Sequence, residues 1–245
     1  MKQFLYFLIS VLFFVQFSGC ESSQKVLILL GGHAYDTLAF MDMFKSMNGF
    51  EFDTMSYFEA FEMLCSDGTE DIDLIVHYHY YPDLPPEDSV MYIQLSEKGT
   101  PMLFLHHSIC SFQSWEGYRQ MVGGRYVLAG YHTDTAYISD YEHDLKLSVE
   151  VLDQKHPVTR GISDFEILDE GYTRLQMEEG ITPLLKTAHP DCTPVVGWTK
   201  DYKNSSSVYL LFGHDHHAFE NPHVKKLIYQ SLIWLLDKKD ASESI

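Results

Sequence analysis

The chain has 245 residues, of which 45% are hydrophobic and 14% aromatic, so it can bury the core of one large domain. Its formal net charge at pH 7 is −18, from 17 basic and 35 acidic residues, and no stretch concentrates Lys or Arg. Nucleic-acid binding requires a basic stripe, and disordered chains are poor in hydrophobic residues, so the composition excludes both classes.

A signal segment opens the chain. Residues 4–17 are apolar apart from Ser10 and Gln16, and they follow the single basic residue Lys2. The run is shorter than the roughly 20 residues that span a bilayer, but it has the size of a signal-peptide core. We therefore predict that residues 1–19 are a signal peptide.

Cys20 follows two small residues, Ser18 and Gly19, as in a bacterial lipobox. This pattern predicts a lipoprotein acylated at Cys20, with residues 20–24 as a short tether. The protein is then lipid-anchored in a bacterial cell envelope, facing the periplasm or the cell surface, and touches the membrane through its lipid alone. An ordinary secretory signal with a chance cysteine is the alternative. The three other cysteines are an odd number, so no complete disulfide framework is expected.

Strands and helices alternate in the first half of the predicted domain, which covers residues 25–237. The predicted strands are 25–30, 50–57, 73–80 and 101–105, and the predicted helices are 36–47, 58–64, 86–98 and 115–121. Short connections between alternating elements favour a parallel sheet with right-handed crossovers. The near-continuous apolar strands agree, because parallel strands are buried on both faces.

The pattern loosens between residues 125 and 207 and then returns to strand and helix. Alternation predicts an exposed antiparallel strand at 146–151, and further strands are predicted at 181–185, 194–199 and 208–212, before a helix at 224–236. Residues 238–245 are predicted to be a frayed tail.

Histidines follow four of the predicted strands. His33 comes after the first strand, His77 and His79 end the third, His106 and His107 follow the fourth, and His214 and His216 follow the last. Ligands of open α/β sheets bind at the carboxyl ends of the strands. The pattern therefore predicts one shared site, although any single histidine could instead be an ordinary core or loop residue.

A carboxylate pair, Asp169 and Glu170, adds to these imidazoles. Such a pair can supply a general acid or base or a metal ligand, or it can simply form a turn. Histidine and carboxylate with an open position suit zinc or another divalent ion, but no tight metal-binding spacing is present. Ser108 and Cys110 lack the glycine frame of a nucleophile elbow, so covalent catalysis is not expected, and Cys110 is predicted to be a small buried residue.

An ordered series of short motifs spans residues 25–237. They are Leu105–Ser108, Trp115–Tyr118, Gly123–Tyr126, His156–Gly161, Asp169–Tyr172, Pro194–Thr199 and Phe212–Asp215, the last followed by Phe219 and Pro222. Together they resemble the trehalose-utilisation (ThuA-like) family. The resemblance implies a flavodoxin-like fold of the class I glutamine-amidotransferase-like superfamily: a three-layer α/β sandwich with a mainly parallel central sheet and antiparallel additions.

The resemblance implies a role in carbohydrate catabolism, often near oxidised (keto) sugars. It does not imply glutamine amidotransferase activity, because the family lacks the amidotransferase cysteine and this chain has histidine at that elbow. One segment departs from the family: a Gly-Lys or Gly-Arg turn is usual before the last strand, where this chain has residues 203–207, Lys-Asn-Ser-Ser-Ser.

These observations favour a protein that acts on a sugar or keto-sugar derivative by acid–base chemistry, as an isomerase, lyase or hydrolase. The predicted catalytic residues are His107, Glu170 and His214. The predicted substrate-binding residues around them are His33, His79, His106, Trp115, Asp169, Tyr172 and Asp215, with the tyrosine and tryptophan stacking on the sugar.

Two other classes stay open: a non-catalytic module that binds a sugar or a partner, and a metal-dependent hydrolase. No cofactor is assigned, and a zinc-like divalent metal belongs to the second alternative. The expected partner is a small sugar derivative, with no nucleic acid. The sequence leaves the oligomeric state open.

Overall fold

The computed structural model describes residues 23–65, 72–83, 85 and 88–243. Its strands are β1 (Gln24–Gly31), β2 (Phe50–Ser56), β3 (Leu74–His79), β4 (Met102–Leu105), β5 (Gly124–Arg125), β6 (Asp140–Val151), β7 (Phe165–Thr173), β8 (Gln176–Met177), β9 (Ile181–Thr187), β10 (Val195–Tyr202) and β11 (Ser205–Leu210). Its α-helices are α1 (Thr37–Lys45), α2 (Tyr57–Cys65), α3 (Asp88–Lys98), α4 (Glu116–Val122), α5 (His216–Glu220) and α6 (Pro222–Glu243), and two 3-10 helices are η1 (His106–Cys110) and η2 (Thr135–Tyr137).

A nine-stranded sheet forms the centre, in the order β2-β1-β3-β4-β11-β10-β9-β6-β7. The first five strands in this order pair in parallel. Strands β3 and β4 are buried at every position, because helices cover both of their faces. The predicted parallel sheet is therefore confirmed.

The other half of the sheet is antiparallel, from β11 through β10, β9 and β6 to β7. Residues 145–151 of β6 alternate between buried and exposed, as the sequence pattern predicts. In the β10–β11 hairpin, Tyr202 pairs with Ser205 across a turn in which Lys203 has φ 53°. Pairing continues up to this turn, so the departure from the family pattern leaves the sheet intact.

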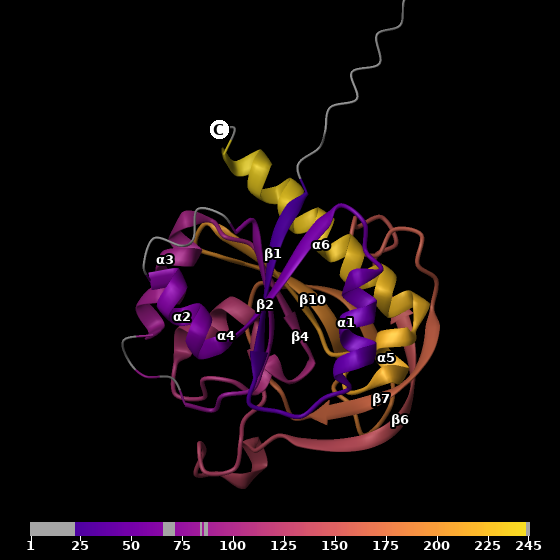
Figure 1. Cartoon of the computed structure of the whole chain (residues 1–245). Coiled ribbons are helices and arrows are strands. Elements are labelled where there is room, and N and C mark those ends of the chain that lie inside the picture. Colours follow the sequence, from indigo (N-terminus) through magenta and orange to yellow (C-terminus); the bar gives the residue numbers. More distant parts are fainter. Residues whose placement is uncertain (1–22, 66–71, 84, 86–87, 244–245) are drawn as a thin grey trace, which may run out of the picture.

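Helices cover the sheet as two outer layers (Figure 1). The helices α2, α3 and α4 lie on one side, and α1, α5 and α6 lie on the other. The helix α1 begins where sequence predicts, since the Asp36 side chain accepts a hydrogen bond from the Ala39 backbone N–H. The result is the predicted three-layer α/β sandwich.

Side chains of β3 divide between the two helical layers. Tyr78 packs against Phe40 and Phe219 on the side of α1 and α5, with ring centroids 4.4 and 6.1 Å away. His77 and His79 point to the opposite face, where His79 lies 5.3 Å from the Phe112 ring. This alternation follows from the two-residue period of a strand, and it separates residues that adjoin in sequence.

One local prediction is wrong, and one alternative that the sequence left open does not hold. The tail predicted from residue 238 is instead helical up to Glu243, because α6 continues along the domain and Lys238 pairs with Asp201 at 3.1 Å. Asp169 and Glu170 lie within β7, not in a turn. The β7 strand was not evident from the sequence because polar residues interrupt its apolar pattern.

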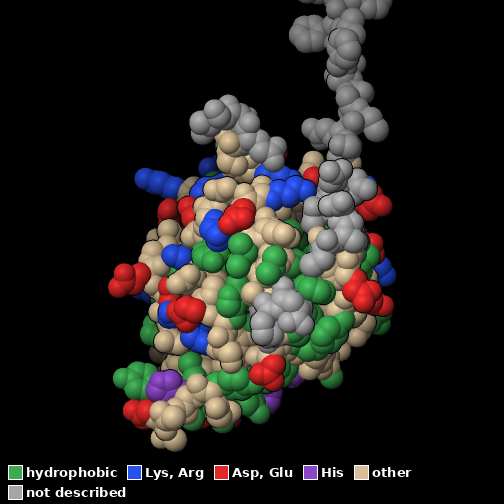
Figure 2. Space-filling view, turned by 90° about the vertical axis from the view of Figure 1, so that its left-hand side faces the viewer, with side chains coloured by type: hydrophobic (Ala, Val, Ile, Leu, Met, Phe, Trp, Pro, Cys, Tyr) green, Lys and Arg blue, Asp and Glu red, His purple; other side chains and the backbone are tan. Residues whose placement is uncertain are grey.

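Acidic and basic side chains are scattered among apolar and polar ones on the face shown in Figure 2, which carries no basic stripe. In the part of the chain that the structure describes, no helix is both long and apolar enough to cross a membrane. The predicted signal peptide and Cys20 lie outside the described residues.

Candidate functional site

A cavity of about 530 Å³ opens at the carboxyl ends of the parallel strands. Imidazoles, tyrosines and one carboxylate dominate its lining: His33, Tyr80, His106, His107, Cys110, Tyr126, Leu128, Tyr141, His143, Glu170, Tyr172 and His214. These residues come from the segments that follow β1, β3, β4, β5 and β11 and from β6 and β7. The three predicted catalytic residues, His107, Glu170 and His214, therefore share one cavity with His33, His106 and Tyr172.

Glu170 is the centre of the polar cluster. Its Oε2 atom lies 3.0 Å from Nε2 of His106 and 3.2 Å from Nδ1 of His214, and its Oε1 atom lies 3.8 Å from Nδ1 of His143. Burial alone would raise the pKa of Glu170, but hydrogen bonds and charge interactions with His106 and His214 hold it well below its usual range. The same contact with Glu170 raises the pKa of His214.

His106 is held in one orientation by three contacts. Its Nδ1–H donates to the backbone carbonyl of Leu211 at 2.7 Å, since a carbonyl oxygen only accepts. Its ring stacks on Tyr172, with centroids 5.2 Å apart, and the Tyr172 hydroxyl lies 3.1 Å from Nε2. The backbone of His106 has φ 48°, a conformation that non-glycine residues seldom adopt and that occurs often at functional sites. These contacts aim Nε2 at Glu170.

Asp169 positions the cluster from behind. Its buried carboxylate accepts hydrogen bonds from the backbone N–H groups of Gly213 at 2.9 Å, His214 at 3.1 Å and Glu170 at 2.8 Å. These bonds join β7 to the loop after β11, so they set where His214 stands relative to Glu170. The sequence suggested that Asp169 contacts the substrate. In the structure Asp169 does not line the cavity, and it supports the site from behind instead.

His107 has a different environment from the Glu170 cluster. Its ring lies between those of Tyr78 and His33, with centroids 4.4 and 5.0 Å away. Burial lowers its pKa well below the ordinary value, so the ring is neutral. Its Nδ1 atom is buried and has no hydrogen-bond partner among the described residues. His107 thus lines the cavity with a neutral ring whose Nδ1 atom is closed off from solvent.

Three of the predicted ligand-contacting residues lie elsewhere. His79 is fully buried and contacts Ser111, because its position on β3 points it under α2–α4. Trp115 packs against Tyr92, with ring centroids 5.7 Å apart. Asp215 caps the start of α5 by accepting a hydrogen bond from the His217 backbone N–H. These placements correct the sequence-based site: none of the three lines the cavity.

Sequence reasoning missed the lining residues that β6 and the segment before it contribute. Tyr126, Leu128, Tyr141 and His143 all lie in the region where the sequence pattern loosens. A break in the β6–β7 register between Glu142 and Leu145 accompanies the turn of this strand toward the cavity. A Tyr-x-His pair at residues 141–143 was the available signal, but nothing local to it indicates proximity to β4 or β11.

Cys110 lies at the cavity wall with little exposure, and burial raises its pKa well above the ordinary value. A thiol in this state is a poor nucleophile. The geometry therefore agrees with the predicted inert role of Cys110.

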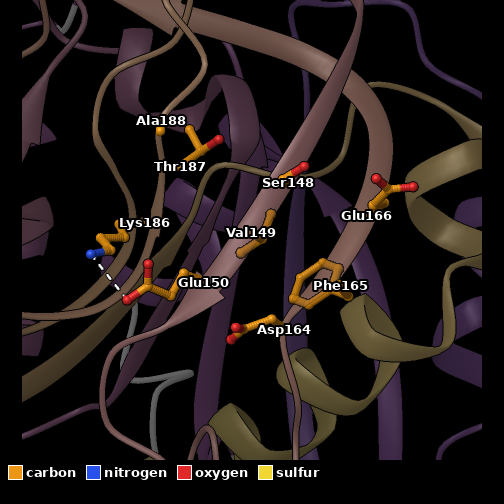
Figure 3. A pocket seen from close by; sticks show the side chains of 9 residues that line it. All are labelled: Ser148, Val149, Glu150, Asp164, Phe165, Glu166, Lys186, Thr187 and Ala188. Carbon is orange, nitrogen blue, oxygen red and sulfur yellow. Dashed lines mark ion pairs between the residues drawn. The ribbon is translucent and has the colours of Figure 1, made fainter.

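A second hollow of about 530 Å³ lies over β6, β7 and β9 (Figure 3). Three of its charged groups already have partners: Glu150 pairs with Lys186 at 3.0 Å, and Asp164 accepts from the Val151 backbone N–H at 2.9 Å. No histidine or cysteine lines it. The imidazole-lined cavity is therefore the candidate site for chemistry.

The fold and the cavity define an α/β protein with a histidine and carboxylate site at the carboxyl ends of its parallel strands. A family model described as trehalose utilisation (ThuA) matches residues 25–235. The chain belongs to the ThuA family, which gives it a carbohydrate-related role at the level of the family. A search of curated proteins by sequence found no match.

Solved structures agree with this assignment. A ThuA-like protein from Parabacteroides merdae has a TM-score of 0.71 and 14% identity, with coverage of 87% of this chain and 90% of that one. One from Bacteroides uniformis has a TM-score of 0.67 and 19% identity, with coverage of 87% and 91%. A β-galactosidase from Bacillus circulans has a TM-score of 0.57 and 12% identity, with coverage of 89% of this chain but 31% of that enzyme. At these identities the likeness shows the fold.

Proposed function

We propose that the protein acts on a sugar or keto-sugar derivative by acid–base chemistry, as an isomerase, lyase or hydrolase. The observation that carries this proposal is the convergence of His107, Glu170 and His214, from three separate segments, on one cavity. The volume of about 530 Å³ falls within the range of small-molecule sites. The ThuA family membership supports a carbohydrate as the ligand.

The cavity lining suits a sugar in two ways. The faces of Tyr80, Tyr126 and Tyr141 give apolar surface on which a sugar ring can pack. Imidazole nitrogens and the Glu170 carboxylate give hydrogen-bond partners for hydroxyl groups. A mixture of flat apolar walls and a few convergent polar groups is typical of specific small-molecule sites.

The proposed catalytic residues have different protonation states, which acid–base chemistry requires. The lowered pKa of Glu170 favours its carboxylate form, and the raised pKa of His214 favours an imidazolium that can donate a proton when no metal ion is bound. Burial lowers the pKa of His107, so its ring is neutral, and the ring lines the same cavity. A charged pair and a neutral imidazole therefore line one cavity, and we propose that they act as acid and base on the same ligand.

Product formation from keto-sugars tests this proposal. The purified protein is incubated with common disaccharides and their 3-keto forms, and products are followed by chromatography and mass spectrometry. We expect turnover of a keto form, with a loss of about 100-fold or more in Glu170→Gln and His107→Ala. His132→Gln, at an exposed position away from the cavity, is the matched control. Saturable binding without product would favour a non-catalytic binding module, and neither binding nor product would overturn the proposal.

We also propose that Cys20 is the acylated first residue of a lipid-anchored cell-envelope protein. The support is the lipobox-like Ser18-Gly19-Cys20 after an apolar segment. Two or three acyl chains hold a protein firmly, since each buried methylene contributes about 0.8 kcal/mol. Wild type should incorporate labelled palmitate and sediment with membranes, whereas Cys20→Ala should do neither. A wild-type protein without label would refute the anchor.

A further inference from the structure

Three side chains of the cavity present donor atoms to a common point. One donor atom from each of His106, Glu170 and His214 lies within 4.8 Å of the other two, and Oε2 of Glu170 contacts both Nε2 of His106 and Nδ1 of His214. From this geometry we propose that the three residues form a binding site for one divalent transition-metal ion, of the zinc type, with open coordination positions toward the cavity.

The distances match a shared ion. The Glu170 oxygen lies 3.0 Å from the His106 nitrogen and 3.2 Å from the His214 nitrogen. Two donors bound to one tetrahedral zinc ion, each about 2.0–2.1 Å from the metal, lie about 3.3 Å apart. Both distances from the Glu170 oxygen are therefore within about 0.3 Å of the spacing that a shared zinc ion requires.

The hydrogen bond between His106 and Leu211 leaves Nε2 as the ring nitrogen that faces the proposed ion. Because Nδ1–H donates to the Leu211 carbonyl, Nε2 is the nitrogen of His106 that faces the Glu170 carboxylate, and a metal ion binding there would displace any proton that it carries. Two lone-pair-bearing atoms 3.0 Å apart need either a proton or a cation between them. A backbone carbonyl on the far nitrogen is also the usual outer partner of a metal-binding histidine.

The supporting contacts hold the donors in place before any ion arrives. Asp169 fixes the backbone of His214 and Glu170 through their N–H groups, and Tyr172 stacks on His106. Such outer contacts distinguish a built site from a chance cluster. The exposed group of Asp215, His216 and His217 also brings three donors together, but it lies at the surface start of α5 and lacks this support.

The donor set restricts the kind of ion. Two imidazoles and one carboxylate suit Zn²⁺, Co²⁺ or Fe²⁺, whereas Mg²⁺ and Ca²⁺ prefer oxygen ligands alone. Three protein ligands leave positions for oxygen atoms of water or of a substrate. Coordination of the adjacent carbonyl and hydroxyl of a keto-sugar rests on the proposed function, but the ion site itself does not.

Metal binding without any sugar tests the site. The purified protein is stripped with a chelator and dialysed, and Zn²⁺ binding is measured by calorimetry, with Co²⁺ absorption as a spectroscopic readout. We expect one equivalent per chain, and a loss of affinity of about 100-fold or more in His106→Ala, Glu170→Gln and His214→Ala. The matched control, His216→Ala with His217→Ala, should bind within about 3-fold of wild type. Mg²⁺ should not compete.

Several results would overturn the site. One is wild-type Zn²⁺ binding no stronger than that of His214→Ala; another is loss of binding in the His216 and His217 variant alone. If the alanine variants fail to fold, anomalous diffraction at the zinc edge decides on wild-type crystals. A peak about 2.0–2.2 Å from the three donor atoms supports the site, and a peak elsewhere or no peak overturns it. If the metal-free protein still turns over a keto-sugar, the ion takes no part in catalysis. If the protein binds Zn²⁺ but turns over no keto-sugar, only the proposed sugar chemistry is overturned.

Discussion

Two buried histidines of β3 predict how the stability of the protein depends on pH. His77 and His79 are fully buried, and Nδ1 of His77 lies 3.2 Å from Nε2 of His79. The Ser111 hydroxyl donates to the His79 backbone carbonyl at 3.0 Å, so it accepts from His79 Nδ1–H at 3.1 Å. His79 Nε2 is therefore an acceptor, and the hydrogen bond from His77 Nδ1–H to it forms when both rings are neutral, while Nε2 of His77 is buried without a partner among the described residues.

Burial lowers the pKa of His79 from 6.5 to about 3, and burial also lowers the pKa of His77 well below 6.5. Above pH 6.5 both the folded and the unfolded chain are neutral at His79, so the full stability is present. As the pH falls from 6.5 toward 3, the unfolded chain binds a proton that the folded chain rejects, and stability is lost. At about pH 5 the loss from His79 is about 2 kcal/mol, at 1.36 kcal/mol per pH unit.

The substitution His79→Gln removes this titration while an amide can still donate to Ser111 and accept from His77. Urea unfolding at about pH 7.5 and about pH 5 gives the free energy of unfolding by linear extrapolation. The difference between the two pH values should be smaller by about 2 kcal/mol in His79→Gln than in wild type. His132→Gln, an exposed histidine replacement, is the control. An unchanged difference in His79→Gln would refute the reasoning.

Three further predictions concern single positions. Asp169→Ala should lower the free energy of unfolding by about 2–4 kcal/mol, because it leaves two backbone N–H groups of the loop after β11 without an acceptor. Urea unfolding measures this loss, and a loss under about 1 kcal/mol would contradict the prediction. Gly123→Ala should lower the free energy of unfolding by about 1–3 kcal/mol in the same assay, because φ is 90° and a Cβ atom there would lie 2.5 Å from Nε1 of Trp198. A variant as stable as wild type would show that α4 ends differently. Cys110→Ala should leave ligand binding or turnover nearly unchanged, since the thiol is buried and protonated, and substrate-protected inactivation of wild type by iodoacetamide would argue the opposite.

The positions of the histidines show where sequence reasoning succeeds. His33, His106, His107 and His214 each follow a strand of the parallel part of the sheet, and all four line the cavity. Their grouping follows from a topological rule, because parallel strands bring their carboxyl ends to one edge. Knowing the strands was therefore sufficient to group these residues.

His79 and Trp115 show where the same reasoning fails. His79 also ends a parallel strand, but its side chain points under α2–α4, since strand side chains alternate between faces. Trp115 lies near the site in sequence and yet packs against Tyr92. Position at a strand end gives the neighbourhood of a side chain, whereas its direction depends on register and on the helix that covers it.

The sequence by itself determined the alternating elements, the parallel half of the sheet and the placement of imidazoles at one edge. These features come from local periodicity and from general rules of chain connection. Only the tertiary structure decided that Glu170 reaches His106 and His214, that Asp169 supports them from behind, and that His143 joins the cavity. The physical reason is that β6 and β7 pair at the far end of the sheet, through contacts between residues distant in sequence. No local sequence pattern specifies that residues of this pair reach the cavity at the carboxyl ends of the parallel strands.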